Sequence, residues 1–323
     1  MINMSFENLI SSELILKNLK HSGYTQPTEI QKASIPLVLN NKDLLASAQT
    51  GTGKTAAFVL PLLENLAINK PAKLAKGQPR FLILSPTREL ANQINTAIGK
   101  YSMGMKLNTV SIIGGESYGS QLRMLAKPID FIIATPGRLM DHLERGRIDL
   151  SKVETVIIDE ADRMLDMGFI EAVEAILALM SHPHQTLLFT ATLDREIIRL
   201  ANDFLNQPEK IELNQKEKTS ATQIEQSIYF IKDHLKFDFL NQLIGEENVF
   251  KAIIFSSTKI NADDLANKLY QLGYRAKALH GDIHQNKRNR ILEQMHRGSI
   301  QFLVATDVVS RGIDIKDITH VFN

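Results

Sequence analysis

A glycine-rich segment at residues 48–55, AQTGTGKT, contains residue types that can bind phosphate. Gly51 and Gly53 can let backbone N–H groups turn inward around a phosphate group. Lys54 can reach the outer phosphates of a nucleoside triphosphate, and the Thr55 hydroxyl can ligate Mg²⁺. A glycine-rich turn without a ligand is the alternative, but the segment follows an apolar run and opens a helical pattern, which favours phosphate binding. The predicted phosphate-binding residues are Ala48, Gln49, Thr50, Gly51, Thr52, Gly53, Lys54 and Thr55, with a small residue, Ala48, at the first position.

A pair of carboxylates follows a second apolar run. Residues 156–162 read VIIDEAD, so Asp159 and Glu160 come directly after a strand-like segment. In an open α/β sheet, ligands bind at the carboxyl ends of the strands. There Asp159 could hold a metal ion together with Thr55, and Glu160 could orient an attacking water. An acidic helix start is the alternative for these residues when they are considered alone.

The elements that would position these residues alternate between strands and helices, which predicts α/β units with parallel sheets covered by helices. Nearly continuous apolar runs indicate strands buried on both faces. The predicted strands of the first part of the chain are 43–48, 80–85, 107–113, 130–135, 155–159, 185–190 and 210–213. The most regular helical patterns are 54–66, 88–101, 169–180 and 194–205.

The chain of 323 residues is long enough for two domains, and a polar stretch suggests where they divide. We predict one domain over residues 1–213, a linker over 214–220 and a second domain over 221–323. The second domain repeats the alternation over a shorter length. Its predicted strands are 224–231, 251–256, 274–279, 301–306 and 318–322.

The composition limits the cellular setting. The formal net charge is +1, so overall charge does not indicate a nucleic-acid-binding protein, and local groups would have to supply such binding. There is no cysteine, which excludes disulfides and thiolate metal sites and fits a reducing compartment. The first ten residues do not resemble a secretory signal, and no apolar run reaches the ~18 residues of a membrane span. These features predict a cytoplasmic protein with no membrane association.

The phosphate segment and the D-E-A-D tetrapeptide together resemble those of the DEAD-box ATP-dependent RNA helicases, and the match extends over essentially the whole chain. The resemblance implies two RecA-like domains, ATP and Mg²⁺ as cofactors, and RNA as partner. Phe6, Gly23-Tyr24 and PTEIQ (27–31) resemble the adenine-reading segment. The resemblance implies that Phe6 and Tyr24 pack on the base and that Gln31 bonds its edge, because an amide matches adenine's donor and acceptor. Alone, Gln31 would be read as a helix surface residue.

Three further segments resemble the elements of the first domain that contact RNA: PTRELA at 86–91, Gly114-Gly115, and TPGRL at 135–139. Each follows a strand, and glycines, helix N-termini and two arginines suit phosphate contacts that do not read bases. An ion pair with Glu89 is the alternative for Arg88. The implied RNA-binding residues here are Pro86, Thr87, Arg88, Gly114, Gly115, Thr135, Pro136, Gly137 and Arg138.

The remaining motifs are implied to couple the sites. TAT at 190–192 stands where the family usually has Ser-Ala-Thr, and Thr190 and Thr192 would link the nucleotide site to the domain interface. Within the second domain, HGDIHQNKR (280–288) and VATDVVSRGIDI (304–315) match family segments. The implied RNA contacts there are Gln285, Arg288 and Thr306, and the implied contacts to the ATP ribose are Gly312 and Asp314.

The family's chain continues beyond the strand that matches ITHVFN (318–323), with an arginine-rich segment that carries the arginine fingers. We therefore expect a C-terminally truncated member with an incomplete second domain. Because an arginine finger contributes ~10³–10⁵ in turnover, such a chain would hydrolyse ATP poorly. Two hypotheses follow: an ATP-dependent RNA helicase that is a fragment, or a non-catalytic protein that binds ATP and RNA. A DNA translocase is a third, which the adenine-reading segment and PTRELA disfavour.

Overall fold

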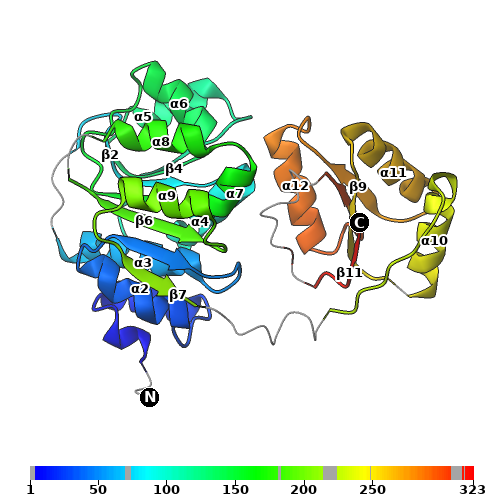
Figure 1. Cartoon of the computed structure of the whole chain (residues 1–323), viewed down its shortest axis with the longest axis horizontal. Helices are drawn as coiled ribbons and strands as arrows, with labels where there is room; N and C mark the ends of the chain where they lie inside the picture. The colour runs from blue at the N-terminus through cyan, green and yellow to red at the C-terminus, as the bar shows by residue number, and fades with distance from the viewer. Residues whose placement is uncertain are drawn as a thin grey trace. The chain divides into compact units, whose positions relative to one another are not determined.

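The chain folds into two compact units, Met1–Lys216 and Glu217–Asn323, in a computed structural model (Figure 1). The structure describes residues 4–69, 74–180, 183–213, 224–247, 249–306, 315 and 317–323. The predicted linker, 214–220, lies outside these residues, so the exact domain boundary remains a prediction. Each unit is described by itself below.

The first unit contains a seven-stranded sheet in which every pairing is parallel, in the order β3-β4-β2-β5-β6-β1-β7. Each of the seven strands overlaps a segment that the sequence predicted, so the predicted fold class is confirmed here. The strands are β1 Leu44–Ser47, β2 Pro79–Leu84, β3 Thr109–Ile112, β4 Ile129–Ala134, β5 Thr155–Ile158, β6 Gln185–Thr190 and β7 Glu209–Glu212.

Helices cover both faces of this sheet (Figure 1). The predicted pattern at 88–101 coincides with α4, and the other three predicted helices match α3, α8 and α9 within two residues at each end. The helical elements are η1 Phe6–Asn8, α1 Glu13–His21, α2 Glu29–Leu39, α3 Lys54–Ile68, α4 Arg88–Tyr101, α5 Tyr118–Leu125, α6 Pro136–Glu144, α7 Ala161–Asp166, α8 Ile170–Ala178 and α9 Arg195–Phe204.

Alternate residues of each strand enter two different cores, which explains the continuous apolar runs. In β1, Leu44 and Ala46 pack in the core beneath α1 to α4, whereas Leu45 packs in the core beneath α5 to α9. Phe81 and Leu82 of β2 divide in the same way. Successive strand side chains point to opposite faces, so a sheet covered on both sides requires apolar residues at every position.

The second unit contains a four-stranded parallel sheet in the order β11-β8-β10-β9. Helices α10 and α11 pack on one face, and α12 packs on the other. The terminal strand β11 pairs with β8, as His320 lies opposite Ala252. The elements are η2 Asp233–Leu235, α10 Lys236–Glu246, β8 Ala252–Phe255, α11 Lys259–Gln271, β9 Ala276–Leu279, α12 Gln285–His296, β10 Phe302–Ala305 and β11 His320–Phe322.

One predicted strand of the second unit is wrong. Residues 224–231 alternate between apolar and polar types, yet they form neither strand nor helix. The side chain of Phe230 is 99% exposed and that of Ile228 is 83% exposed. A strand needs a hydrogen-bonded neighbour, and the apolar residues of this segment find no core among the described residues, so the alternation alone does not produce a strand.

Candidate functional site

The predicted phosphate segment forms the loop between β1 and α3, where two glycines adopt the left-handed conformation. Gly51 has φ 82° and Gly53 has φ 93°. A methyl group on Gly53 would collide with the Gln31 side-chain amide, so glycine is required there for both conformation and space. The loop is fixed to the sheet because the Ala48 N–H donates to the Thr190 carbonyl over 3.0 Å. The local fold therefore presents a helix N-terminus at the carboxyl end of a central strand.

Two opposite charges lie buried at this sheet edge, and each has a polar atom without a hydrogen bond among the described residues. Lys54 is 7% exposed and Asp159 is 4% exposed, and both Lys54 Nζ and Asp159 Oδ1 lack a hydrogen bond. Burial raises the pKa of Asp159, while the charge of Lys54 opposes this rise. Buried charges are normally paired and hydrogen-bonded, so these two atoms beside a glycine-rich loop suit a charged ligand.

Glu160 occupies a strained and desolvated position next to Asp159. Its backbone is left-handed, with φ 55°, at the N-cap of α7. Burial, and then the negative charge of Asp159, raises the pKa of Glu160 to about 7, although the charge of Arg163 opposes the shift. The Arg163 guanidinium pairs with the Glu160 carboxylate over 3.1 Å. A carboxyl group poised near neutrality beside a phosphate-binding loop suits proton transfer or the orientation of water.

The residues of the TAT segment at the end of β6 form hydrogen bonds with one another and with nearby carboxylates. The Thr190 hydroxyl donates to the Thr192 carbonyl over 2.8 Å, and the Thr192 hydroxyl donates to the Asp194 carboxylate over 2.8 Å. The Ala191 N–H donates to the Asp162 carboxylate over 3.2 Å. Thr190 thus keeps a hydrogen bond despite its additional methyl group, and the segment is joined to the acidic segment after β5.

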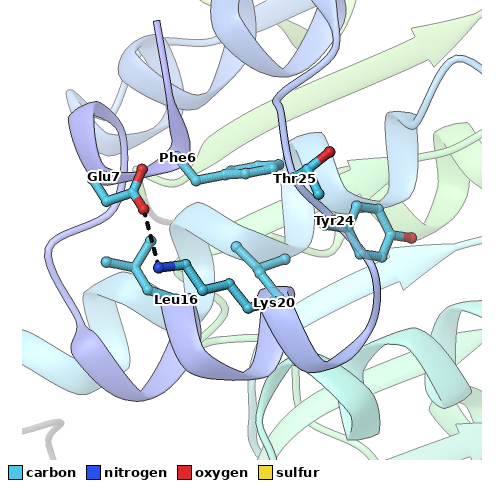
Figure 2. A pocket seen from close by; sticks show the side chains of 7 residues that line it. Phe6, Glu7, Leu16, Lys20, Tyr24 and Thr25 are labelled. Atoms are coloured by element: carbon cyan, nitrogen blue, oxygen red, sulfur yellow. Dashed lines mark ion pairs between the residues drawn. The ribbon is translucent and has the colours of Figure 1, made fainter.

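A small pocket lies between η1, α1 and the segment that leads to α2. Its volume is about 300 Å³, and it is lined by Phe6, Glu7, Leu16, Leu19, Lys20, Tyr24 and Thr25. Figure 2 shows Phe6 and Tyr24 lining it, together with the ion pair between Glu7 and Lys20, whose charged atoms are 3.6 Å apart. The Tyr101 hydroxyl donates to the Tyr24 hydroxyl over 2.8 Å and so fixes that ring. The structure therefore brings together two of the three residues predicted to hold adenine.

Gln31, the third predicted residue, does not line this pocket. Its side chain is 1% exposed, and both ends of its amide have protein partners. Gln31 Oε1 accepts from the Thr28 N–H over 3.0 Å, and Nε2 donates to the Gly53 carbonyl over 3.1 Å. In this structure Gln31 therefore connects the start of α2 to the phosphate-binding loop.

A buried glutamate that no sequence motif marks connects the N-terminal segment to α3. Glu64 is 2% exposed, and its carboxylate accepts from the Ser11 N–H over 2.7 Å, from the Ser12 N–H over 3.2 Å and from the Ser11 hydroxyl. Ser12 is the N-cap of α1. Since Ser11 lies 53 positions before Glu64, no local pattern could have revealed this contact.

The predicted RNA-binding residues of the first unit lie at the ends of β2, β3 and β4, which are neighbours in the sheet. The Thr87 hydroxyl caps α4 by accepting from the Leu90 N–H over 3.2 Å. The Arg88 guanidinium lies against Gly114 and Gly115, where a side chain on Gly115 would collide with it. The glycine pair thus provides the space in which Arg88 lies.

The third segment begins α6 beside these two. Pro136 is at the first helical position, and the Thr135 N–H donates to the Ile112 carbonyl over 3.1 Å. Arg138 Nη1 donates to the Gln121 side-chain oxygen over 3.2 Å. Burial raises the pKa of the Glu116 carboxyl, while Arg138 and Arg88 oppose the rise. The structure therefore gathers all three predicted segments around two arginines.

The predicted residues of the second unit are less exposed than expected. Gln285 and Arg288 are 2% and 4% exposed on α12. The Thr306 N–H donates to the Leu279 carbonyl over 3.3 Å. Gly312 and Asp314 lie outside the described residues, so their predicted contacts with the ATP ribose, like the RNA contacts of this unit, remain predictions.

Neither a metal cluster nor a membrane span is present in the described parts of the chain. No group of three or more histidine, cysteine, aspartate or glutamate side chains is arranged to hold a metal ion in these segments. None of their helices combines the length and the apolar character needed to cross a membrane.

Comparisons with known proteins match the two units of the chain to two helicase domains. The DEAD/DEAH box helicase family model matches residues 28–200, and the helicase conserved C-terminal domain model matches residues 235–323. The chain is 42% identical over 319 residues to the DEAD-box ATP-dependent RNA helicase CshA of Geobacillus kaustophilus, covering 99% of this chain and 67% of the relative. It is 41% identical over 322 residues to CshA of Bacillus subtilis, covering 100% of this chain and 64% of the relative. The chain thus spans about two thirds of the length of these relatives.

Solved structures give the same result. Dbp5 of S. cerevisiae, bound to RNA and ADP BeF3, aligns with a TM-score of 0.84 and 30% identity, over 98% of this chain and 79% of that one. A DEAD box protein from Methanococcus jannaschii aligns with a TM-score of 0.58 and 37% identity, over 96% and 82% of the two chains. With two parallel-sheet units, a phosphate-binding loop and the D-E-A-D segment at one sheet edge, and these matches along its length, the chain belongs to the DEAD/DEAH box helicase family.

Proposed function

We propose that this chain is an ATP-dependent RNA helicase that binds RNA duplexes and opens them locally with the free energy of ATP hydrolysis. The observation that carries the proposal is the pair of buried charges, Lys54 and Asp159, whose Nζ and Oδ1 atoms lack hydrogen bonds among the described residues, on the same sheet edge as Arg88 and Arg138. The relatives named above are ATP-dependent RNA helicases, and Dbp5 is bound to RNA and ADP BeF3.

The residues at the phosphate-binding loop suit ATP and Mg²⁺. Backbone N–H groups of the loop and Lys54 would hold the phosphates, and Thr55 and Asp159 would hold Mg²⁺, which neutralises phosphate charge. Glu160 would orient the attacking water. Phe6 and Tyr24 line a pocket that would take the adenine. Gln31 would read the base edge by exchanging a protein partner for the base.

The RNA would contact the backbone-donating loops and arginines of the first unit. Arg88 and Arg138 supply positive charge for phosphates, and the N-terminal turns of α4 and α6 supply backbone N–H groups. Because such contacts do not read base edges, we expect binding that is largely independent of sequence. Gln285, Arg288 and Thr306 would add contacts from the second unit, Gly312 and Asp314 would approach the ribose, and a cytoplasmic location would give access to RNA.

RNA-stimulated ATP hydrolysis by the 323-residue chain tests the proposal. We expect slow phosphate release that increases with added RNA, requires Mg²⁺ and accompanies strand separation of a short RNA duplex. ATP and RNA binding without hydrolysis would favour the non-catalytic alternative. Failure to bind either ligand would refute both functions.

A further inference from the structure

A buried glutamine lies behind the loops that carry the two RNA-facing arginines. Gln121, on α5, is 0% exposed, although it is a polar residue. Its amide contacts the Ile113 carbonyl at 2.9 Å, Arg138 Nη1 at 3.2 Å and His142 Nε2 at 2.9 Å, and it also hydrogen-bonds the Glu116 side chain. The first three groups come from the end of β3 and from α6, so one side chain connects two of the segments assigned to RNA.

Two of these contacts set the orientation of the Gln121 amide. Gln121 Nε2 donates to the Ile113 carbonyl, so Gln121 Oε1 is the atom that accepts from Arg138. Because Oε1 also faces His142 Nε2, that nitrogen carries the proton, and in the neutral ring Nδ1 carries none. Nδ1 is buried and has no partner among the described residues. Burial, and then the charge of Arg138, lowers the pKa of His142, which is consistent with this neutral tautomer.

The Arg138 guanidinium also lies near an aromatic ring. Its guanidinium carbon lies 5.9 Å from the centroid of the Tyr118 ring. The His142 imidazole stacks on the same ring at 4.4 Å with an interplanar angle of 6°, and the Arg145 guanidinium carbon lies 5.3 Å from its centroid. Gln121 and Tyr118 both lie on α5, so this helix contacts Arg138 twice. A guanidinium placed in this way loses less freedom when it binds a phosphate than a freely rotating one.

The same glutamine reaches Arg88 indirectly. Ile113 precedes Gly114 and Gly115, and the Arg88 guanidinium lies against those two glycines. The hydrogen bond from Gln121 to the Ile113 carbonyl therefore holds the start of the loop on which Arg88 lies.

We propose that Gln121 is a positioning residue for RNA binding: it orients Arg138 directly, and Arg88 through the Ile113–Gly115 loop, without touching RNA. This inference rests on the proposed function, because it takes both arginines to bind RNA phosphates. It assigns a separate role to a residue that lies outside the motifs noted in the sequence.

The test substitutes Gln121→Met, which keeps the length of the side chain and removes its polar atoms. The probe is a fluorescently labelled ten-nucleotide oligouridylate, titrated into the full chain with a non-hydrolysable ATP analogue at several salt concentrations. We expect affinity to fall about 3- to 10-fold, as for the loss of one typical hydrogen bond. We also expect the salt slope to decrease by up to about 0.7, as for one phosphate contact on a single strand. A merely destabilised protein would lose active fraction but keep the slope.

The matched control is Gln185→Met, at the amino end of β6. Gln185 is likewise buried and bonded through both amide ends, to the Val38 and Lys42 carbonyls and to the Thr155 hydroxyl. Its substitution should lower stability to a similar degree and leave the salt slope unchanged. Equal slopes for both variants and the unsubstituted chain would overturn the inference.

A double-mutant cycle separates this inference from the proposed function. Arg138→Gln should weaken RNA binding, and Gln121→Met should then cause a smaller further loss than it causes alone. If Arg138→Gln weakens binding and the two effects simply add, the positioning role is wrong while the proposed function stands. If the unsubstituted chain binds no oligouridylate, the proposed function fails and this inference fails with it.

Discussion

The two halves of the ligand edge in the first unit differ in how their charges are satisfied. At the ends of β1 and β5, Lys54 and Asp159 are buried, and Lys54 Nζ and Asp159 Oδ1 have no hydrogen-bond partner among the described residues. At the ends of β3 and β4, Arg138 already has a hydrogen bond to Gln121 and a neighbouring aromatic ring. The first half therefore contains buried charged atoms without hydrogen bonds, whereas the arginine of the second half is already oriented by neighbouring side chains.

This difference corresponds to the two kinds of ligand. A compact triphosphate with a metal ion can enter a desolvated site and satisfy buried charges, because interactions in such a site are strong. RNA is a long polyanion that has to dissociate from the protein at many phosphate contacts. Half-exposed, well-oriented arginines allow such contacts to form and break at the surface. If the comparison is correct, a substitution in one half should change the binding of one ligand, ATP or RNA, and leave the binding of the other unchanged.

The largest effect is expected at Lys54. Lys54→Gln should reduce ATP turnover at least ~100-fold, because it removes a preorganised charge from a desolvated site. RNA affinity in the absence of nucleotide should stay within a factor of about two of the unsubstituted chain. Parallel ATPase and anisotropy titrations measure both quantities, with Lys100→Gln, an exposed substitution on α4, as control. A comparable loss of ATP turnover and of RNA affinity would show that the two halves do not act separately.

A second prediction concerns the stability of the nucleotide half without its ligand. The pKa of Glu160 is raised from 4.5 to about 7, so its contribution to stability is present below pH 4.5 and is lost as the pH rises through 7. Above pH 7 the folded chain carries a buried carboxylate at a cost, which Glu160→Gln removes. The free energy of unfolding of the variant, relative to the unsubstituted chain, should rise by up to about 3 kcal/mol between pH 4.5 and pH 8.

Urea denaturation at several pH values, in EDTA and without nucleotide, measures this difference. Glu174→Gln is the control, since Glu174 forms an ion pair with Arg199 at 2.7 Å on a partly exposed surface. The difference for the control should be nearly independent of pH. A pH-independent difference for Glu160→Gln as well would mean that its carboxyl is not desolvated.

A third prediction tests whether the nucleotide half extends to the N-terminal segment. Glu64→Gln exchanges a carboxylate oxygen for an amide that cannot accept all the hydrogen bonds from Ser11 and Ser12. We expect a loss of ~1–2 kcal/mol in stability and a several-fold weaker affinity for ATP, with RNA binding unchanged. Affinity for inorganic triphosphate is the internal control, because it does not use the base pocket. Equal weakening for both ligands would mean that Glu64 does not act through that pocket.

The smallest effect is expected in the RNA half. Gly115 has φ 80°, and a methyl group there would collide with the Arg88 guanidinium. Gly115→Ala should therefore displace Arg88 and weaken RNA binding about 5-fold, with ATP affinity unchanged. Gly99→Ala, on the same helix as Arg88 and in open space, should leave RNA binding intact and stabilise α4 slightly. No effect of Gly115→Ala on RNA binding would remove Arg88 from the proposed surface.

The sequence predicted the strands of the first unit well, and it placed the candidate site residues at their ends, for a physical reason. Strands buried on both faces are apolar at every position, and ligand-binding residues follow directly at their carboxyl ends, so both signals are local. Thr190 and Asp159 illustrate this, because each lies at or just after the end of a predicted strand.

The features that the sequence missed depend on contacts between distant residues. Glu64 and Gln121 are polar residues within helical patterns, and only the fold shows that they are buried and bonded. The hydrogen bond from Gln31 to the Gly53 carbonyl, 22 positions away, likewise has no local signal in the sequence. The prediction of a strand at 224–231 was wrong. Alternating apolar and polar residues indicate which side chains could be buried, but a strand also needs a neighbouring strand to pair with.

Calorimetric titration of ATP with Mg²⁺ into the 323-residue chain and two variants tests the central comparison most directly. The unsubstituted chain and Arg138→Gln should bind one equivalent of ATP with similar affinity, and Lys54→Gln should bind at least tenfold more weakly. Equal binding by all three proteins, or an equal loss in both variants, would contradict the division of this sheet edge into a nucleotide half and an RNA half.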